Sequence, residues 1–270
     1  MTAPLLQRPI SRRRDAARRR RVCACGGPLL AGAPAAAAQE LPAIPALTSF
    51  LAGRSPRRER LRLELPSLAD NGQAVPMRLT MAGPFAPGAA LKAIHLFSEV
   101  NPVPEMAVFE FPSPPPKVEI DTRIRLAGSQ HVVAIAVMSD GSAVRGGRRS
   151  HRHRRRLPAT GADESDRPMA DSRIIVPPQT RRGEAIEVRI SIRHAMETGY
   201  RTDEGGKPIP RNVIRSFACR YNGEPVFAVR MSSGIAANPY LRFLSRRASP
   251  ERWTSSGSTM PARAERRRRR

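Results

Sequence analysis

Alternation between apolar and polar residues dominates the patterned parts of this chain and predicts β-strands. In residues 186–193, the apolar Ile186, Val188, Ile190 and Ile192 alternate with polar side chains. A period of two places successive side chains on opposite faces of a sheet, so this pattern indicates a half-buried strand. Further strands are expected at residues 75–81, 91–98, 106–111, 117–126, 132–138, 217–221, 225–231 and 240–244.

The stretch 117–126 has the cleanest alternation in the chain. One face is apolar, with Val118, Ile120, Ile124 and Leu126. The other face is charged, and we expect all of its side chains to point into water: Lys117, Glu119, Asp121, Arg123 and Arg125.

Turn signals separate the expected strands at short intervals. Asn222-Gly223 lies between two apolar runs and is the strongest short hairpin signal. No helical repeat accompanies these strands. The pattern therefore predicts an all-β protein with two small antiparallel sandwiches in tandem, which pack together because each half is small for a core of its own.

The formal charge of +24 is concentrated in four short basic segments: residues 1–30, 54–62, 145–156 and 246–270. Only Lys92, Lys117 and Lys207 are Lys, and Trp253 is the one aromatic residue in these segments. Proteins that bind single-stranded nucleic acid usually interleave aromatic side chains that stack on bases. Disordered, solvated charge is therefore favoured over specific nucleic-acid binding, although salt-dependent adhesion to polyanions is expected.

The N-terminus has the order of zones found in an export signal. Ser11-Arg12-Arg13 is similar to a twin-arginine start, residues 22–38 are weakly apolar, and Ala36 to Ala38 offer a cleavage site. The charged run 18–21 interrupts this order, and the alternative is a disordered basic tail. We favour a degraded twin-arginine-like signal over residues 1–38, which would direct the protein to the periplasm.

No spacing of residues argues for a catalytic site. His151 and His153 could share a metal ion, but the seven Arg residues of the run 145–156 would repel a cation, so a solvated run is favoured. His95 is expected on the outer face of its strand, and His131 and His194 at strand ends. The Cys residues are Cys23 and Cys25 in the export segment and Cys219, which we expect to be a small apolar filler rather than a reactive thiol.

Several long motifs resemble a known pair of families. LADNGQAVPMRLTM, KAIHLFSEVNPVPEMAVFEF and DTRIRLAGSQHVVAIAVMSDGS resemble SoxY of thiosulfate oxidation, over residues 64–143. GEAIEVRISIRHAMETGYRTDEGGKPIPRNVIRSFACRYNGEPVF and GIAANPYLRF resemble SoxZ, over residues 173–244. The order is similar to that of a fused SoxYZ sulfur-carrier chain. The resemblance implies immunoglobulin-like sandwiches at 64–143 and 171–246. The stretch 39–63 before them is Pro- and Arg-rich and is predicted to be a linker, with a damaged first element as the alternative.

The same resemblance implies a carrier and not an enzyme, with no cofactor. In this family a Cys on a mobile arm at the end of SoxY carries sulfur among partners such as cytochrome SoxAX, SoxB and SoxCD. Here the arm is expected after Val144, but no Cys occurs between Cys25 and Cys219. We therefore expect a basic linker at 144–170 in place of the arm, a disordered tail at 247–270, a lost edge strand in each sandwich, and no carrier activity.

Two further readings follow from the basic segments and from related carriers. Arg-rich runs without strand alternation are what an out-of-frame reading of GC-rich coding sequence would produce, a hypothesis that the nucleotide sequence read in all three frames would test. Alternative functions are a SoxYZ-like carrier that serves a quinoprotein dehydrogenase and a non-specific polyanion-binding protein. Neighbouring genes would separate the two carrier readings.

Overall fold

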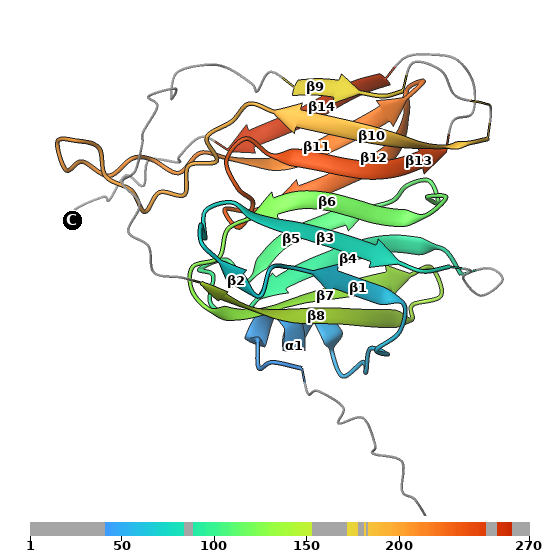
Figure 1. Ribbon diagram of the computed structural model, residues 1–270, viewed down its shortest axis with the longest axis horizontal. Coiled ribbons are helices and arrows are strands. Elements are labelled where there is room, and N and C mark those ends of the chain that lie inside the picture. Colours follow the sequence, from blue (N-terminus) through green and yellow to red (C-terminus); the bar gives the residue numbers. More distant parts are fainter. Residues whose placement is uncertain are drawn as a thin grey trace, which may run out of the picture. The chain divides into compact units, whose positions relative to one another are not determined.

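The computed structural model describes residues 41–83, 89–152, 172–177, 181, 183–246 and 253–260. The predicted export segment, with Cys23 and Cys25, lies outside these residues, as does His153. The elements are helix α1 (Pro45–Leu51) and strands β1 (Leu61–Glu64), β2 (Leu68–Ala69), β3 (Val75–Met81), β4 (Leu91–Ser98), β5 (Glu105–Glu110), β6 (Val118–Ile124), β7 (Gln130–Met138), β8 (Ala143–Arg152), β9 (Ser172–Ile175), β10 (Ala185–Ile192), β11 (Val213–Tyr221), β12 (Glu224–Met231), β13 (Tyr240–Arg246) and β14 (Trp253–Met260) (Figure 1).

The strands form two sheets, and each sheet draws strands from both halves of the chain. The six-stranded sheet has the order β1-β3-β6-β13-β10-β9, and the eight-stranded sheet has the order β14-β11-β12-β5-β4-β7-β8-β2. All neighbours pair antiparallel except β2 and β8, which are parallel. The prediction of an all-β protein with tandem sandwiches is confirmed. The halves pack edge to edge, because β6 pairs with β13 and β5 with β12.

Local sequence explains the strands and turns that were predicted. β3 and β4 have the predicted bounds, and β3 has the strict burial alternation that its apolar positions predict. The hairpin between β11 and β12 turns at Asn222 and Gly223, whose φ angles are 52° and 85°. Both residues therefore have the left-handed backbone that an Asn-Gly hairpin turn requires.

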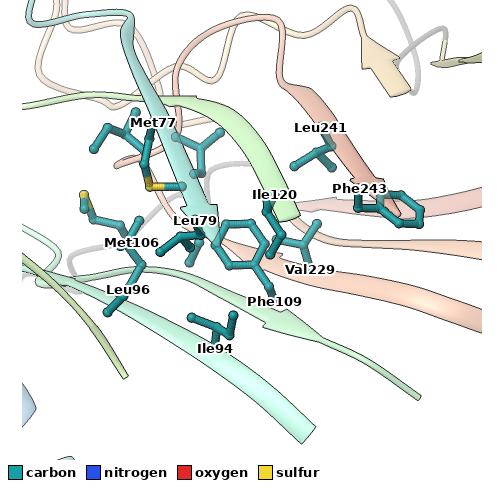
Figure 2. Packing of buried hydrophobic residues seen from close by; sticks show 14 of the residues in the cluster. Met77, Leu79, Ile94, Leu96, Met106, Phe109, Ile120, Val229, Leu241 and Phe243 are labelled. Atoms are coloured by element: carbon teal, nitrogen blue, oxygen red, sulfur yellow. The ribbon is translucent and has the colours of Figure 1, made fainter. Parts of the chain in front are cut away.

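One hydrophobic core lies between the two sheets and continues across both halves. Figure 2 shows side chains from both layers meeting there, with Leu79 and Ile120 on the six-stranded sheet and Ile94 and Phe109 on the eight-stranded sheet. Phe227 of β12 lies at the junction of the halves, with its ring centroid 4.1 Å from that of Phe243 and 5.8 Å from that of Phe111. The junction is therefore part of the core rather than a boundary between two cores.

A smaller cluster fixes α1 on the outer face of the eight-stranded sheet. Ile44, Leu47 and Leu51 are buried together with side chains of the sheet: Phe97, Val133 and Ile135. The segment 39–63 was predicted to be a linker, but it contains this helix and the first three residues of β1. The helix was missed because it is only seven residues long and its surroundings are rich in Pro, so no extended helical repeat marks it in the sequence. No helix in the described part of the chain has the length and apolarity to cross a membrane.

Two basic segments that were predicted to be irregular form strands. Residues 144–152, expected in a linker, belong to β8, and residues 253–260 of the expected disordered tail form β14. β8 pairs with β7 from Ala143 to Ser150, and β14 pairs with β11 along its length. The prediction that each sandwich has lost an edge strand is therefore wrong for the part of the chain that the structure describes. Backbone pairing, rather than apolar alternation, places these two segments.

Candidate functional site

The end of the SoxY-like half is where a carrier arm is expected, and the chain remains within a sheet there. β8 continues past Val144 through Gly146 and Gly147 and stays paired with β7 as far as Ser150. The Ser150 hydroxyl donates to the Pro66 carbonyl oxygen at 2.9 Å. The segment that follows Val144 is thus held on its β7 side and near its end.

Cys219 lies near the C-terminal end of β11 and is completely buried, with an exposed fraction of 0%. Its neighbours across the sheet are Phe227 on β12 and Ser255 on β14. Burial raises the pKa of the Cys219 thiol to about 12, because the thiolate would lose its hydration. A thiol that is enclosed and protonated at neutral pH is a poor nucleophile.

The histidines do not come together. His151 is exposed on β8, and no group of three or more His, Cys, Asp or Glu in the described ranges is placed to hold a metal ion. His95 lies on the outer face of β4, as predicted, with its Nδ1 atom 2.8 Å from Glu105 and its ring 4.2 Å from that of Phe50. His131 is 3.0 Å from Glu99. These contacts fix loops and α1 rather than form a reactive centre.

Arg125 contradicts the prediction that its side chain faces water. Its guanidinium turns inward and donates to the carbonyl oxygens of Met196 at 2.6 Å and Ala195 at 3.2 Å. Asn101 donates to the Arg125 carbonyl at 2.8 Å and accepts from Gln130 at 2.9 Å. Arg125 therefore ties loops of the two halves together at the end of the sandwich where β8 finishes, since Gln130 pairs with Ser150.

Sequence reasoning missed this loop network because carbonyl acceptors leave no pattern in a sequence. Arg125 follows the alternation of its strand, but the strand ends at Ile124, so the side chain is no longer bound to the outward face. Burial lowers the pKa of the Arg125 guanidinium, with the nearby charge of Glu197 acting in the opposite sense. The only available signal for this role would have been a positively charged side chain, that of Arg125, opposite the short turn at Ala195 and Met196.

His194 lies in the same network as the acceptor of a backbone hydrogen bond. The Met196 N–H donates to His194 Nδ1 at 2.9 Å, so the neutral ring carries its proton on Nε2. Met196 has a φ of 50°, and this hydrogen bond supports its left-handed turn. Burial lowers the pKa of His194, against a smaller opposite effect of Asn212.

We expect the stability of the fold to fall as pH drops below the ordinary histidine pKa of 6.5. The unfolded chain binds a proton at His194 more readily than the folded one, so acid favours unfolding. The measurement is urea unfolding at pH 8 and pH 5.5 for the wild type and His194→Asn, which keeps an acceptor near the Nδ1 position. The variant should lose less stability between the two pH values, and an equal loss would contradict this assignment.

Comparison with known families identifies both halves of the chain. The model of SoxY, the sulfur oxidation protein, matches residues 48–149, and that of SoxZ, the sulphur oxidation protein, matches residues 174–252. No curated protein matches the chain. The SoxY match extends over most of β8, and the SoxZ match ends just before β14. The two matches together span well over half of the chain, which thus joins a SoxY region to a SoxZ region in the order of a fused SoxYZ protein.

Proposed function

We propose that this chain is the body of a periplasmic SoxYZ-type sulfur carrier that does not itself carry sulfur covalently. Membership of a sulfur-oxidation carrier family follows from the two family matches. The single observation that carries the proposal is the position of Cys219, which is buried in the core on β11, a strand that lies between β12 and β14 in the sheet.

Covalent carriage of sulfur needs a thiolate that can enter the active site of a partner enzyme. The thiol of Cys219 has a pKa of about 12, so only a very small fraction is ionised at neutral pH. Its side chain also has no exposed surface. Exposing it would require β11 to separate from β12 or β14, which would break the eight-stranded sheet within the SoxZ region.

On this proposal the partners are the enzymes of the Sox cycle, cytochrome SoxAX, SoxB and SoxCD. The order of the two regions supports this reading, as does the N-terminal pattern for export to the periplasm. Such a body could still dock to these enzymes through its surface, but it would bring no bound sulfur to them.

We expect no sulfur adduct on Cys219 in the folded protein. The test uses the full chain with Cys23→Ser and Cys25→Ser, so that Cys219 is the remaining thiol. After incubation with a polysulfide donor, intact-mass spectrometry should show the unmodified mass. In urea the same thiol should react with iodoacetamide within minutes, because unfolding removes its burial.

A positive control comes from β8, where Arg149 is exposed. Arg149→Cys in the same Ser background places an accessible thiol on the strand that replaces the arm, and this variant should form the adduct. A stoichiometric adduct on Cys219 in the folded chain, at a rate similar to that of the control, would overturn the proposal.

A further inference from the structure

In the six-stranded sheet, few paired residues join the SoxY region to the SoxZ region. β6 and β13 align only two residue pairs, Asp121 with Arg242 and Ile120 with Phe243. In the other sheet, β5 and β12 align four pairs. Backbone pairing alone therefore specifies the register of β6 against β13 weakly, and side chains must supply the rest.

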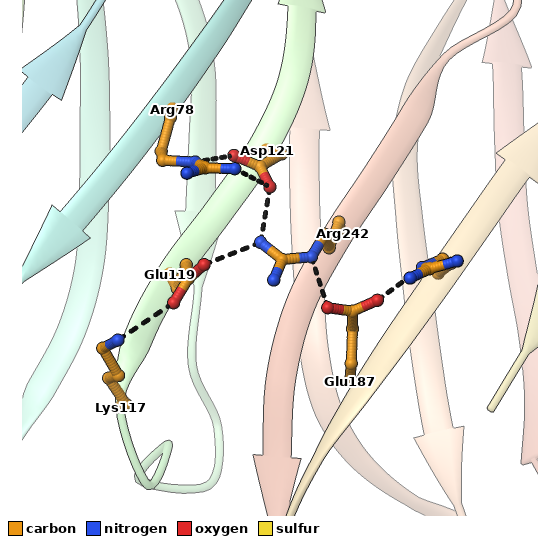
Figure 3. A network of polar contacts seen from close by, with 7 residues as sticks. Arg78, Lys117, Glu119, Asp121, Glu187 and Arg242 are labelled. Carbon is orange, nitrogen blue, oxygen red and sulfur yellow. Dashed lines mark hydrogen bonds and ion pairs between the residues drawn. The ribbon is translucent and has the colours of Figure 1, made fainter. Parts of the chain in front are cut away.

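Arg242 of β13 reaches across this junction on the outward face of the sheet (Figure 3). Its Nη1 atom lies 2.7 Å from Glu119 and 2.5 Å from Asp121, both on β6 of the SoxY region. Its Nε atom lies 2.6 Å from Glu187 on β10 of the SoxZ region. One guanidinium thus joins three carboxylates on both sides of the junction, and only 19% of its side chain is exposed.

The other cations that contact these three carboxylates each pair with an acid of their own region. Arg78 pairs with Asp121 at 2.6 Å, and Lys117 pairs with Glu119 at 3.1 Å, both inside the SoxY region. Arg189 pairs with Glu187 inside the SoxZ region. Hydrogen bonding to Arg242 holds the pKa of Glu119 below its ordinary value, so this carboxylate remains ionised near neutral pH. Among these cations, Arg242 is the one that pairs with carboxylates of both regions.

We propose that Arg242 is the residue by which the SoxZ region recognises the SoxY region. The partner that it fits is a sheet edge with two carboxylates two residues apart on its outward face, as Glu119 and Asp121 lie on β6. The planar guanidinium suits such an edge, because its donors point in fixed directions toward separate carboxylates. An edge shifted by one residue would direct these acids into the core and leave Arg242 with Glu187 of its own region but without a partner across the junction.

The first test compares Arg242→Met with Arg189→Met in the full chain. Both variants remove one cation from Glu187, but only the first removes the bond across the junction. Hydrogen exchange should rise several-fold in β6 and β13 for Arg242→Met and remain unchanged in β4. The Tm of Arg242→Met should fall by about 5 °C. Equal exchange and equal Tm in the two variants would overturn the proposal.

The second test asks whether the acids are what Arg242 recognises. Adding Glu119→Gln and Asp121→Asn to Arg242→Met should restore at least half of the lost Tm, because the two largely buried carboxylates that lost the guanidinium would then be neutral. This gain is expected to exceed the loss of the more exposed pairs that Lys117 and Arg78 make with the same acids. No recovery would mean that Arg242 acts through packing of its hydrocarbon chain, and the proposal would fail. If Arg242→Met does not fold, Arg242→Lys against Arg189→Lys provides the same comparison. These readouts need no sulfur chemistry, so they are independent of the proposed function.

Discussion

Replacing Phe227 with Ala should lower the free energy of unfolding by about 3–5 kcal/mol, a large share of the stability of an ordinary domain. The Phe227 side chain is fully buried, and its ring lies against those of Phe243, Phe111 and Phe109. These partners come from both regions and both sheets. The truncation would leave a cavity at the junction that neighbouring strands cannot close without losing their own pairing.

Urea unfolding of the full chain, followed by circular dichroism, measures this loss. Tyr200→Ala is the matched control, because that ring is 72% exposed and its removal should change stability by less than about 0.5 kcal/mol. A Phe227→Ala variant as stable as the control would show that the junction is not part of the core.

Replacing Gly146 with Ala should destabilise the protein by about 1–3 kcal/mol, an unusual cost for adding one methyl group to a strand. A Cβ atom at Gly146 would lie 2.6 Å from the carbonyl oxygen of Leu61 on β1. The obstacle is backbone rather than a flexible side chain, so β8 or β1 would have to move. The expected result is a lower urea midpoint with an unchanged m-value.

The neighbouring Gly147 provides the control for this experiment. A Cβ atom there would meet only ordinary contacts, at 3.5 Å from the Val132 carbonyl oxygen and 3.8 Å from the Val133 side chain. Gly147→Ala should therefore be neutral or slightly stabilising, since Ala restricts the unfolded chain. Equal effects of the two substitutions would mean that β8 does not lie against β1 as described.

The strands that could be predicted from the sequence are those whose two faces see different surroundings. β3 and β10 alternate because one face meets the core and the other meets water. β8 could not be predicted in this way, because Gly146 is buried against backbone while Arg148 and Arg149 are exposed on successive positions. β14 consists mostly of small polar residues, and its position comes from pairing with β11.

The candidate site divides in a similar way. The absence of a Cys between Cys25 and Cys219 can be read directly from the chain, and an apolar environment for Cys219 follows from the alternation around it. The roles of Arg125 and Arg242 could not be predicted, because each contacts residues in the other half of the chain. The edge-to-edge joining of the halves also leaves no local signal, since edge and central strands share the same alternation.

Shared layers have a consequence for how this molecule comes apart. β5 pairs with β12 and β6 pairs with β13, so ordinary sheet pairing joins the two halves. If one half unfolded alone, two strands of the other half would lose their neighbours. A calorimeter should therefore record one heat-absorption peak rather than two. After a protease cuts the chain between β8 and β9, the two fragments should still elute together in size-exclusion chromatography, because sheet pairing holds them.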